Sequence, residues 1–128
     1  MHPAANYVLH LLLSGVLLSA FFIIYTKLTP FNEVQLIRGG NTAAAVSLGG
    51  ALIGFSLTLA SALFHTTSYE SFLIWSFSAM VVQILAYLIT TTLLRMSKDQ
   101  IEANNTAFGG LLAAISLSIG AINAGCIS

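Results

Sequence analysis

Apolar residues fall into four long runs separated by short polar connectors. The runs cover about residues 5–28, 41–64, 69–94 and 106–127, and only Lys27 and Glu70 bring charge into them, close to their ends. About 20 helical residues cross a bilayer, because a helix rises 1.5 Å per residue. Lipid offers no hydrogen bonds to an open strand, so the runs should be helices. The pattern predicts an all-α integral membrane protein with four transmembrane helices in a single transmembrane domain.

Composition points to the same class. Hydrophobic residues make up 57% and charged residues 6% of the 128 residues, and the mean hydropathy is +0.92. A soluble domain is usually about a quarter charged. Four Lys and Arg balance four Asp and Glu, which leaves no basic surface for a nucleic acid. The expected partner is therefore the lipid bilayer, and no nucleic acid is expected.

The basic residues indicate an orientation. All four of them lie in or beside the first and third connectors: Lys27, Arg38, Arg95 and Lys98. Short cytoplasmic loops of membrane proteins carry an excess of Lys and Arg. We therefore expect both of these connectors in the cytoplasm and both termini on the other side of the membrane.

A weak internal repeat has an offset of 64 residues. Asn41-Thr42-Ala43 recurs as Asn105-Thr106-Ala107, and Ile37 recurs as Ile101. Repeat units of about 1–64 and 65–128 would each contain two helices and so face the same way in the membrane. The sequence thus predicts a tandem duplication of a two-helix unit.

Small residues indicate which helices pack together. The second apolar run contains Gly50 and Gly54 four residues apart, and the fourth contains the row Gly110, Ala114 and Ser118. Such rows let helix backbones approach closely in lipid. We expect the second membrane helix to pack against the fourth through these rows.

The first connector holds a conspicuous polar set. A short helix is expected over residues 30–37, with Thr29 as its N-cap. Asn32, Glu33 and Arg38 are candidate residues for recognition by a cytoplasmic partner. A Glu33–Arg38 ion pair would be exposed and would contribute little stability.

Five other polar residues are candidates for function. His10, Gln83 and Asn123 lie within the apolar runs, where polar groups usually face other helices and either form structural hydrogen bonds or line a pathway. Asn41 and Asn105 precede the second and fourth runs. They are expected either as helix caps or as an anion-binding mouth formed by two helix N-termini.

The residue inventory argues against an enzyme. No paired carboxylates or His-x-x-x-His spacing occurs within an apolar run, and Cys126 is the single cysteine. Zinc sites and disulfides need several such residues. We expect no catalytic site, no metal site and no cofactor.

Four segments carry a resemblance to a known family. The stretch from Ile24 to Ile37, containing Thr-Pro-x-Asn-Glu, and the following Asn41-Thr42-Ala43-Ala44 resemble the signature of the domain of unknown function 350 family. Asn105-Thr106-Ala107 and the stretch from Ile122 to Cys126 also fit. The resemblance implies a small protein of the bacterial inner membrane, with periplasmic termini under the orientation above. It implies no particular activity, and family members are often encoded near envelope-stress proteins.

Two functional hypotheses follow. The first is a homo-oligomer that conducts ions or small solutes between its copies, past residues such as Gln83, Ser19, Ser47 or Thr58. The alternative is a non-catalytic membrane module whose two cytoplasmic connectors anchor or recruit a cytoplasmic stress-response protein.

Overall fold

The computed structural model describes residues 3–29, 32–93 and 97–127. Within them, four helices are long and apolar enough to cross a membrane: α1 (Pro3–Leu28), α3 (Thr42–His65), α4 (Tyr69–Leu93) and α6 (Thr106–Cys126). The short helices α2 (Glu33–Arg38) and α5 (Ser97–Glu102) precede α3 and α6. The four-span prediction is confirmed, with boundaries within two residues of those expected. Leu94, the expected end of the third span, lies outside the described residues.

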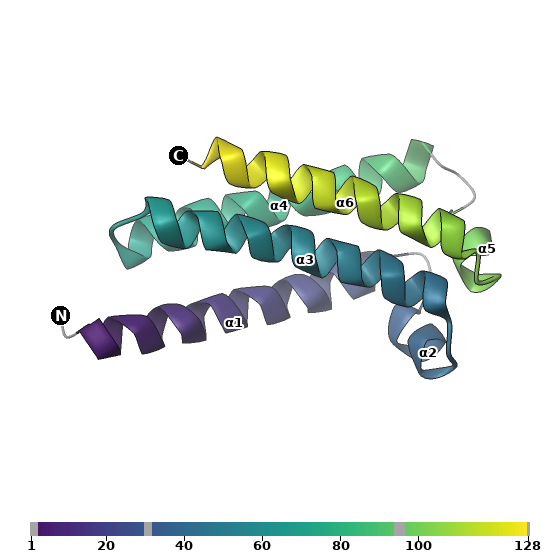
Figure 1. The fold of residues 1–128 in the computed structure, drawn as a ribbon, viewed down its shortest axis with the longest axis horizontal. Helices are drawn as coiled ribbons and strands as arrows, with labels where there is room; N and C mark the ends of the chain where they lie inside the picture. The colour runs from purple at the N-terminus through teal and green to yellow at the C-terminus, as the bar shows by residue number, and fades with distance from the viewer. Residues whose placement is uncertain (1–2, 30–31, 94–96, 128) are drawn as a thin grey trace.

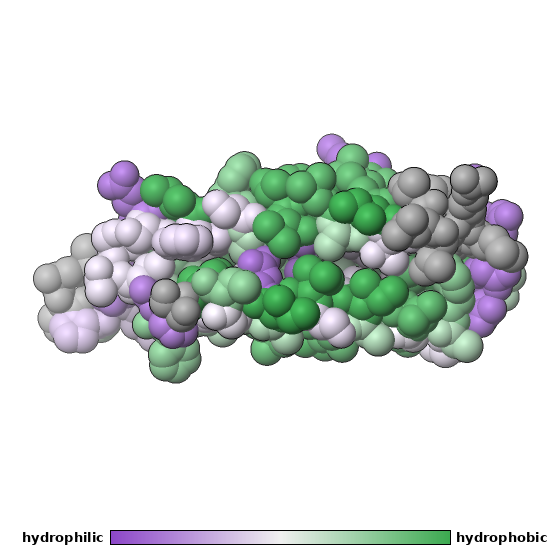
Figure 2. Space-filling view, turned by 90° about the horizontal axis from the view of Figure 1, so that it is seen from above, coloured by the Kyte–Doolittle hydropathy of each residue, from purple (hydrophilic) through white to green (hydrophobic). Residues whose placement is uncertain are grey.

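The long helices run side by side along the molecule, and successive ones alternate in direction (Figure 1). Both chain termini lie at one end of the bundle, and α2 and α5 lie at the other. Hydrophobic residues dominate the middle of the face in Figure 2, and hydrophilic ones gather towards its two ends. This distribution is the one expected of a protein whose middle is surrounded by lipid.

The α3 and α6 helices pack backbone against backbone. A Cβ added to Gly109 would lie 2.5 Å from the carbonyl oxygen of Ala43, and one added to Gly50 would lie 2.5 Å from Cα of Ala113. A Cβ on Gly120 would collide with the backbone of Gly54. The predicted contact between the second and fourth membrane helices is therefore confirmed, and glycine makes it possible.

The predicted contact row on α6 is wrong. A Cβ on Gly110 would meet no atom within 4 Å, and Ala114 and Ser118 are exposed. The face that touches α3 is turned by one residue and contains Gly109, Ala113, Ser116 and Gly120. Both rows consist of small residues at helical spacing, so residue size alone does not distinguish them.

Side-chain hydrogen bonds to backbone carbonyls reinforce the position of α6. From α3, the Thr58 hydroxyl donates to Gly120 O at 3.1 Å and the Ser61 hydroxyl to Ala124 O at 2.5 Å. From α4, the Gln83 amide donates to Ser116 O at 2.9 Å. Buried polar groups in a membrane protein need such partners, and here they join three helices.

The α1 helix is attached mainly through the half of it nearer α2. Its two buried residues are Phe21 and Tyr25. The Phe21 ring stacks on Phe55 of α3, and the Tyr25 ring packs on Tyr87 of α4, each pair with centroids 4.6 Å apart. The rest of α1 leaves most of its surface to lipid or to another chain.

The turns before α3 and α6 have the same geometry at the repeat offset. The Asn41 N–H donates to Leu36 O and the Asn105 N–H donates to Gln100 O, both at 2.9 Å. The residue before each asparagine has positive φ, 88° at Gly40 and 60° at Asn104, and Asn adopts this conformation more readily than most residues. The matching turns are compatible with a duplication, which stays a prediction.

Alanine at Gly120 should separate α3 from α6, because its Cβ would overlap the Gly54 backbone. We expect Gly120→Ala to destabilise the protein by about 1–3 kcal/mol. The matched control Gly110→Ala, in open space on the same helix, should be neutral or slightly stabilising, since alanine favours a helix. Thermal unfolding in detergent micelles measures both, and equal stability of the two variants would contradict this packing.

Candidate functional site

Glu33 is a buried carboxylic acid at the start of α2, with 1% of its surface exposed. The helix begins there because the Asn32 side chain accepts a hydrogen bond from Gln35 N at 3.1 Å. The prediction that Thr29 is the N-cap is wrong, because the Thr29 hydroxyl donates to Thr26 O at 3.0 Å. Asn is a strong N-cap residue, and this cap places Glu33 in the first turn of α2, against the bundle.

Three long helices supply the surroundings of Glu33. Tyr25 of α1, Ser47 of α3 and Tyr87 of α4 are each buried. The Tyr25 hydroxyl lies beside the Ser47 hydroxyl, and both tyrosines interact electrostatically with Glu33. These four residues, Tyr25, Glu33, Ser47 and Tyr87, are called the Glu33 cluster below. They bring four hydroxyl or carboxyl groups from four helices to one end of the bundle.

Within the described residues, no cation compensates the carboxyl group. Lys27 and Arg38, the nearest basic residues in sequence, are exposed, and neither carboxylate oxygen makes a hydrogen bond of regular geometry there. Burial raises the pKa of Glu33 to about 8, and the nearby Thr29 hydroxyl acts weakly in the opposite direction. Glu33 therefore carries a proton at neutral pH, which avoids a buried, unpaired charge.

The burial of Glu33 overturns the expected exposed Glu33–Arg38 ion pair. Asn32 and Arg38 are exposed while Glu33 faces inward. The physical reason lies in the α2 sequence, since Glu33, Leu36 and Ile37 have the i, i+3, i+4 spacing of one helix face. Leu36 and Ile37 pack against the bundle, so Glu33 is carried inward with them.

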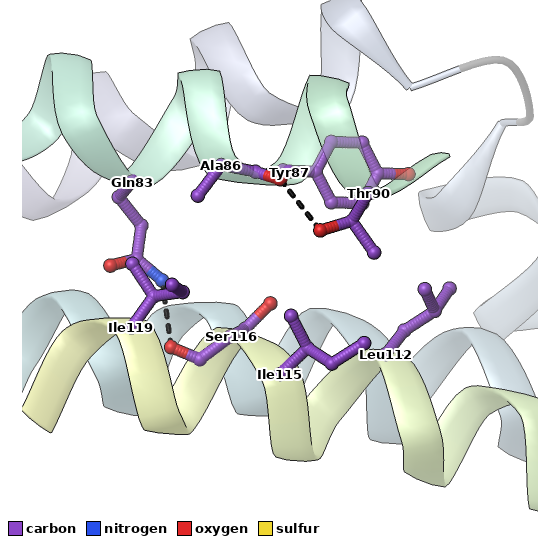
Figure 3. A pocket seen from close by; sticks show the side chains of 8 residues that line it. All are labelled: Gln83, Ala86, Tyr87, Thr90, Leu112, Ile115, Ser116 and Ile119. Carbon is purple, nitrogen blue, oxygen red and sulfur yellow. Dashed lines mark hydrogen bonds between the residues drawn. The ribbon is translucent and has the colours of Figure 1, made fainter. Parts of the chain in front are cut away.

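Gln83 links helices. Its side chain is 3% exposed and points from α4 towards α6, where its amide nitrogen bonds to Ser116 (Figure 3). Its carbonyl oxygen is buried without a hydrogen-bond partner among the described residues. The cavity beside it, which Tyr87 and Thr90 also line, measures about 10 Å³, and such a space holds roughly one water molecule. This cavity is too small to be a path for solutes.

His10 and Asn123 have structural contacts near the end where the termini lie. His10 Nδ1 is 2.9 Å from Asn6 O, and the ring stacks on Tyr69 with centroids 4.6 Å apart. The Tyr69 hydroxyl donates to Asn6 Oδ1 at 2.8 Å. The Asn123 amide instead reaches Ala79 O of α4 at 3.2 Å. Both side chains hold helices together, and a role in a pathway stays a prediction.

Asn41 and Asn105 are helix caps in the structure. Asn41 Oδ1 accepts from Ala44 N at 2.9 Å, while its amide donates to Ile101 O of α5 at 2.7 Å. Asn105 Oδ1 accepts from Phe108 N at 3.2 Å. Capping explains both residues, and the anion-binding mouth stays a prediction.

Of the residues considered as pathway lining, Ser19 is exposed on α1, while Ser47 and Thr58 are buried. Only Ser47 joins the Glu33 cluster. Tyr25 and Tyr87 did not stand out in the sequence as functional residues, because aromatic residues near helix ends are common at membrane interfaces. Among the described residues, no group of three or more His, Cys, Asp or Glu side chains could hold a metal ion.

Replacing Glu33 with Gln should change how stability depends on pH. With the pKa raised from 4.5 to about 8, the folded state binds the proton more tightly, so wild-type stability should fall as pH rises through this interval. The glutamine side chain cannot ionise, so Glu33→Gln should resemble wild type near pH 5 and be more stable above about pH 8, by on the order of 3 kcal/mol. Thermal unfolding across this range tests the difference, with the exposed Glu102→Gln as control. If the stability of wild type and of Glu33→Gln depended on pH in the same way, Glu33 would not be a buried carboxyl group without a compensating charge.

Comparison with known proteins identifies the family. The family model described as Domain of Unknown Function (DUF350) matches residues 1–127. The proteins called UPF0719 inner membrane protein YjfL from Escherichia coli strain K12 and from Escherichia coli O157:H7 are each 34% identical over 108 residues, which cover 84% of this chain and 82% of theirs. No solved structure matches the chain significantly. With its four apolar helices and these relatives, the chain is a multi-pass inner-membrane protein and belongs to the DUF350 family.

Proposed function

We propose that the protein is a non-enzymatic homo-oligomer that lets protons or small cations cross the inner membrane, with Glu33 as the ionisable group of the pathway. The observation that carries the proposal is the burial of Glu33, which is 1% exposed and has no ion pair among the described residues. Ionisable residues are costly inside a membrane protein, and those found there commonly serve ion or proton movement.

The packing of a single chain is the support for proposing an oligomer. The contact between α3 and α6 is too close to contain a water path, and the cavity beside Gln83 is small. A path for a hydrated ion would therefore run between copies. A groove of about 300 Å³ along α1 and α3, lined in part by Gly15, Ser56 and Ala60, offers small residues to a helix of a second copy.

The proposed orientation places the Glu33 cluster at the cytoplasmic side. Arg38 and Lys98 lie in α2 and α5, which share one end of the bundle (Figure 1). Basic residues favour the cytoplasmic side, so both termini would be periplasmic.

Reporter fusions test this orientation. Alkaline phosphatase, which is active only in the periplasm, should be active when fused after Ser128 and inactive when fused after Gly39, in the first connector. The reverse pattern would place Glu33 at the periplasmic side.

Proton flux tests the function. Liposomes containing the purified protein and a trapped pH dye should acidify when a negative internal potential is imposed. Glu33→Gln should slow the flux roughly 10-fold or more, because glutamine cannot exchange a proton. Glu102→Gln, which alters an exposed carboxylate of α5, should retain wild-type flux. Equal flux from wild type and Glu33→Gln, or no flux above protein-free liposomes, would contradict the proposal.

A second candidate function is recruitment of a cytoplasmic envelope-stress partner. The observation that favours it is that α2 and α5 share one end of the bundle, where the Asn41–Ile101 hydrogen bond ties the start of α3 to α5. Arg38, Asp99 and Glu102 are exposed there. Inactive liposomes, together with a pull-down that is lost in Arg38→Glu, would favour recruitment over conduction.

A further inference from the structure

We propose that the Glu33 cluster binds a monovalent alkali cation, which replaces the proton on the Glu33 carboxyl group. The inference rests on the proposed function, in which Glu33 belongs to an ion pathway, and it names the class of ion that the site would accept. Its basis is the set of buried oxygen atoms that the bundle gathers at this end.

The oxygen atoms have few partners of their own. Within the described part of the chain, the Tyr25 hydroxyl, the Ser47 hydroxyl and both Glu33 carboxylate oxygens are buried without a hydrogen bond of regular geometry. The side chains of Tyr25, Ser47 and Glu33 are 1%, 0% and 1% exposed, respectively. A buried polar atom left unsatisfied destabilises a protein by about 1–3 kcal/mol. Several such atoms at one place point to a ligand that satisfies them together, and hard cations prefer oxygen ligands.

The charge of the cluster selects a monovalent ion. Glu33 is its one carboxylate. Tyr25 of α1 and Tyr87 of α4 interact electrostatically with it, the Thr29 hydroxyl lies beside it, and the Ser47 hydroxyl of α3 lies beside that of Tyr25; all four are neutral hydroxyls. Lys27 and Arg38 are exposed and do not occupy the site. One negative charge balances one positive charge, whereas calcium and magnesium sites usually contain several carboxylates or retain several waters.

Binding would proceed as an exchange. The protonated carboxyl group releases its proton to water as the O–H bond breaks, and the carboxylate then holds the cation, with no change of oxidation state. The net charge of the buried cluster is zero both before and after the exchange, so neither end state contains an unpaired buried charge. Because the two ions compete for one group, raising the cation concentration should lower the apparent proton affinity of Glu33.

Proton release tests the exchange without any membrane crossing. NaCl added to purified wild-type protein in weakly buffered detergent near neutral pH should release up to about one proton per chain, read with a pH-indicator dye. Choline chloride at the same ionic strength should release none, because choline is too large for the cluster. Glu33→Gln should release none in either salt.

The neutral oxygens provide matched variants. Ser47→Ala and Tyr25→Phe leave the carboxyl group in place, so each should require roughly 10-fold more Na⁺ for the same release, equivalent to about 1.4 kcal/mol. Ser56→Ala changes an exposed serine of α3 and should behave as wild type. Thermal unfolding of wild type above about pH 8, where Glu33 ionises, should show a higher Tm in NaCl than in choline chloride.

Three outcomes would overturn the cation site: equal proton release in NaCl and choline chloride, release that persists in Glu33→Gln, or an equal wild-type Tm in the two salts. The last comparison needs no variant and so decides the matter even if a substitution prevents folding. Proton flux in liposomes without Na⁺-dependent proton release would support the proton pathway and contradict the cation site. Na⁺-dependent proton release without proton flux in liposomes would contradict the transport function and support the cation site.

Discussion

The backbone contact between α3 and α6 is the constraint on which the other positions depend. Glycines on both helices let the two backbones meet, and the Thr58 and Ser61 hydroxyls bond to α6 carbonyls. Because the two helices run in the same direction, their capped N-termini lie together, joined through Asn41 to α5. The connectors α2 and α5 must then share one end of the bundle. The connector from α1 to α3 turns at this end, and α2 packs against α3 there.

The position of α2 explains the chemistry at this end. Its inward face carries Leu36 and Ile37, whose burial is favourable, and Glu33, whose burial is not. The protein compensates with a proton, and the pKa of Glu33 is raised to about 8 as a result of its burial. The neutral hydroxyls of Thr29, Tyr25 and Tyr87 lie near the carboxyl group, and that of Ser47 lies beside Tyr25. The same arrangement that makes ionisation unfavourable creates a place where a small cation could substitute for the proton.

The sequence was sufficient for the coarse architecture and insufficient for the site. Hydropathy located the four spans, since lipid demands long apolar helices whatever their contacts. Glycine content identified α3 and α6 as partners but not the face of α6, because Gly109 and Gly110 begin equally small rows. The sequence alone predicts an exposed Glu33, because a charged residue in a connector is usually exposed. Its burial depends on Tyr25 and Tyr87, which lie far apart in the chain and meet only through the packing of α1 on α4.

The protonation state of Glu33 is the central claim, and infrared spectroscopy measures it directly. The spectrum of wild type minus that of Glu33→Gln, recorded on protein in lipid at neutral pH, should contain the carbonyl stretch of a protonated carboxyl group. This band should move on transfer to deuterated water and disappear above about pH 8, as the carboxyl group ionises. A difference spectrum with only carboxylate bands at neutral pH would show that Glu33 is ionised. That result would contradict the claim that Glu33 is a buried carboxyl group kept neutral by a proton.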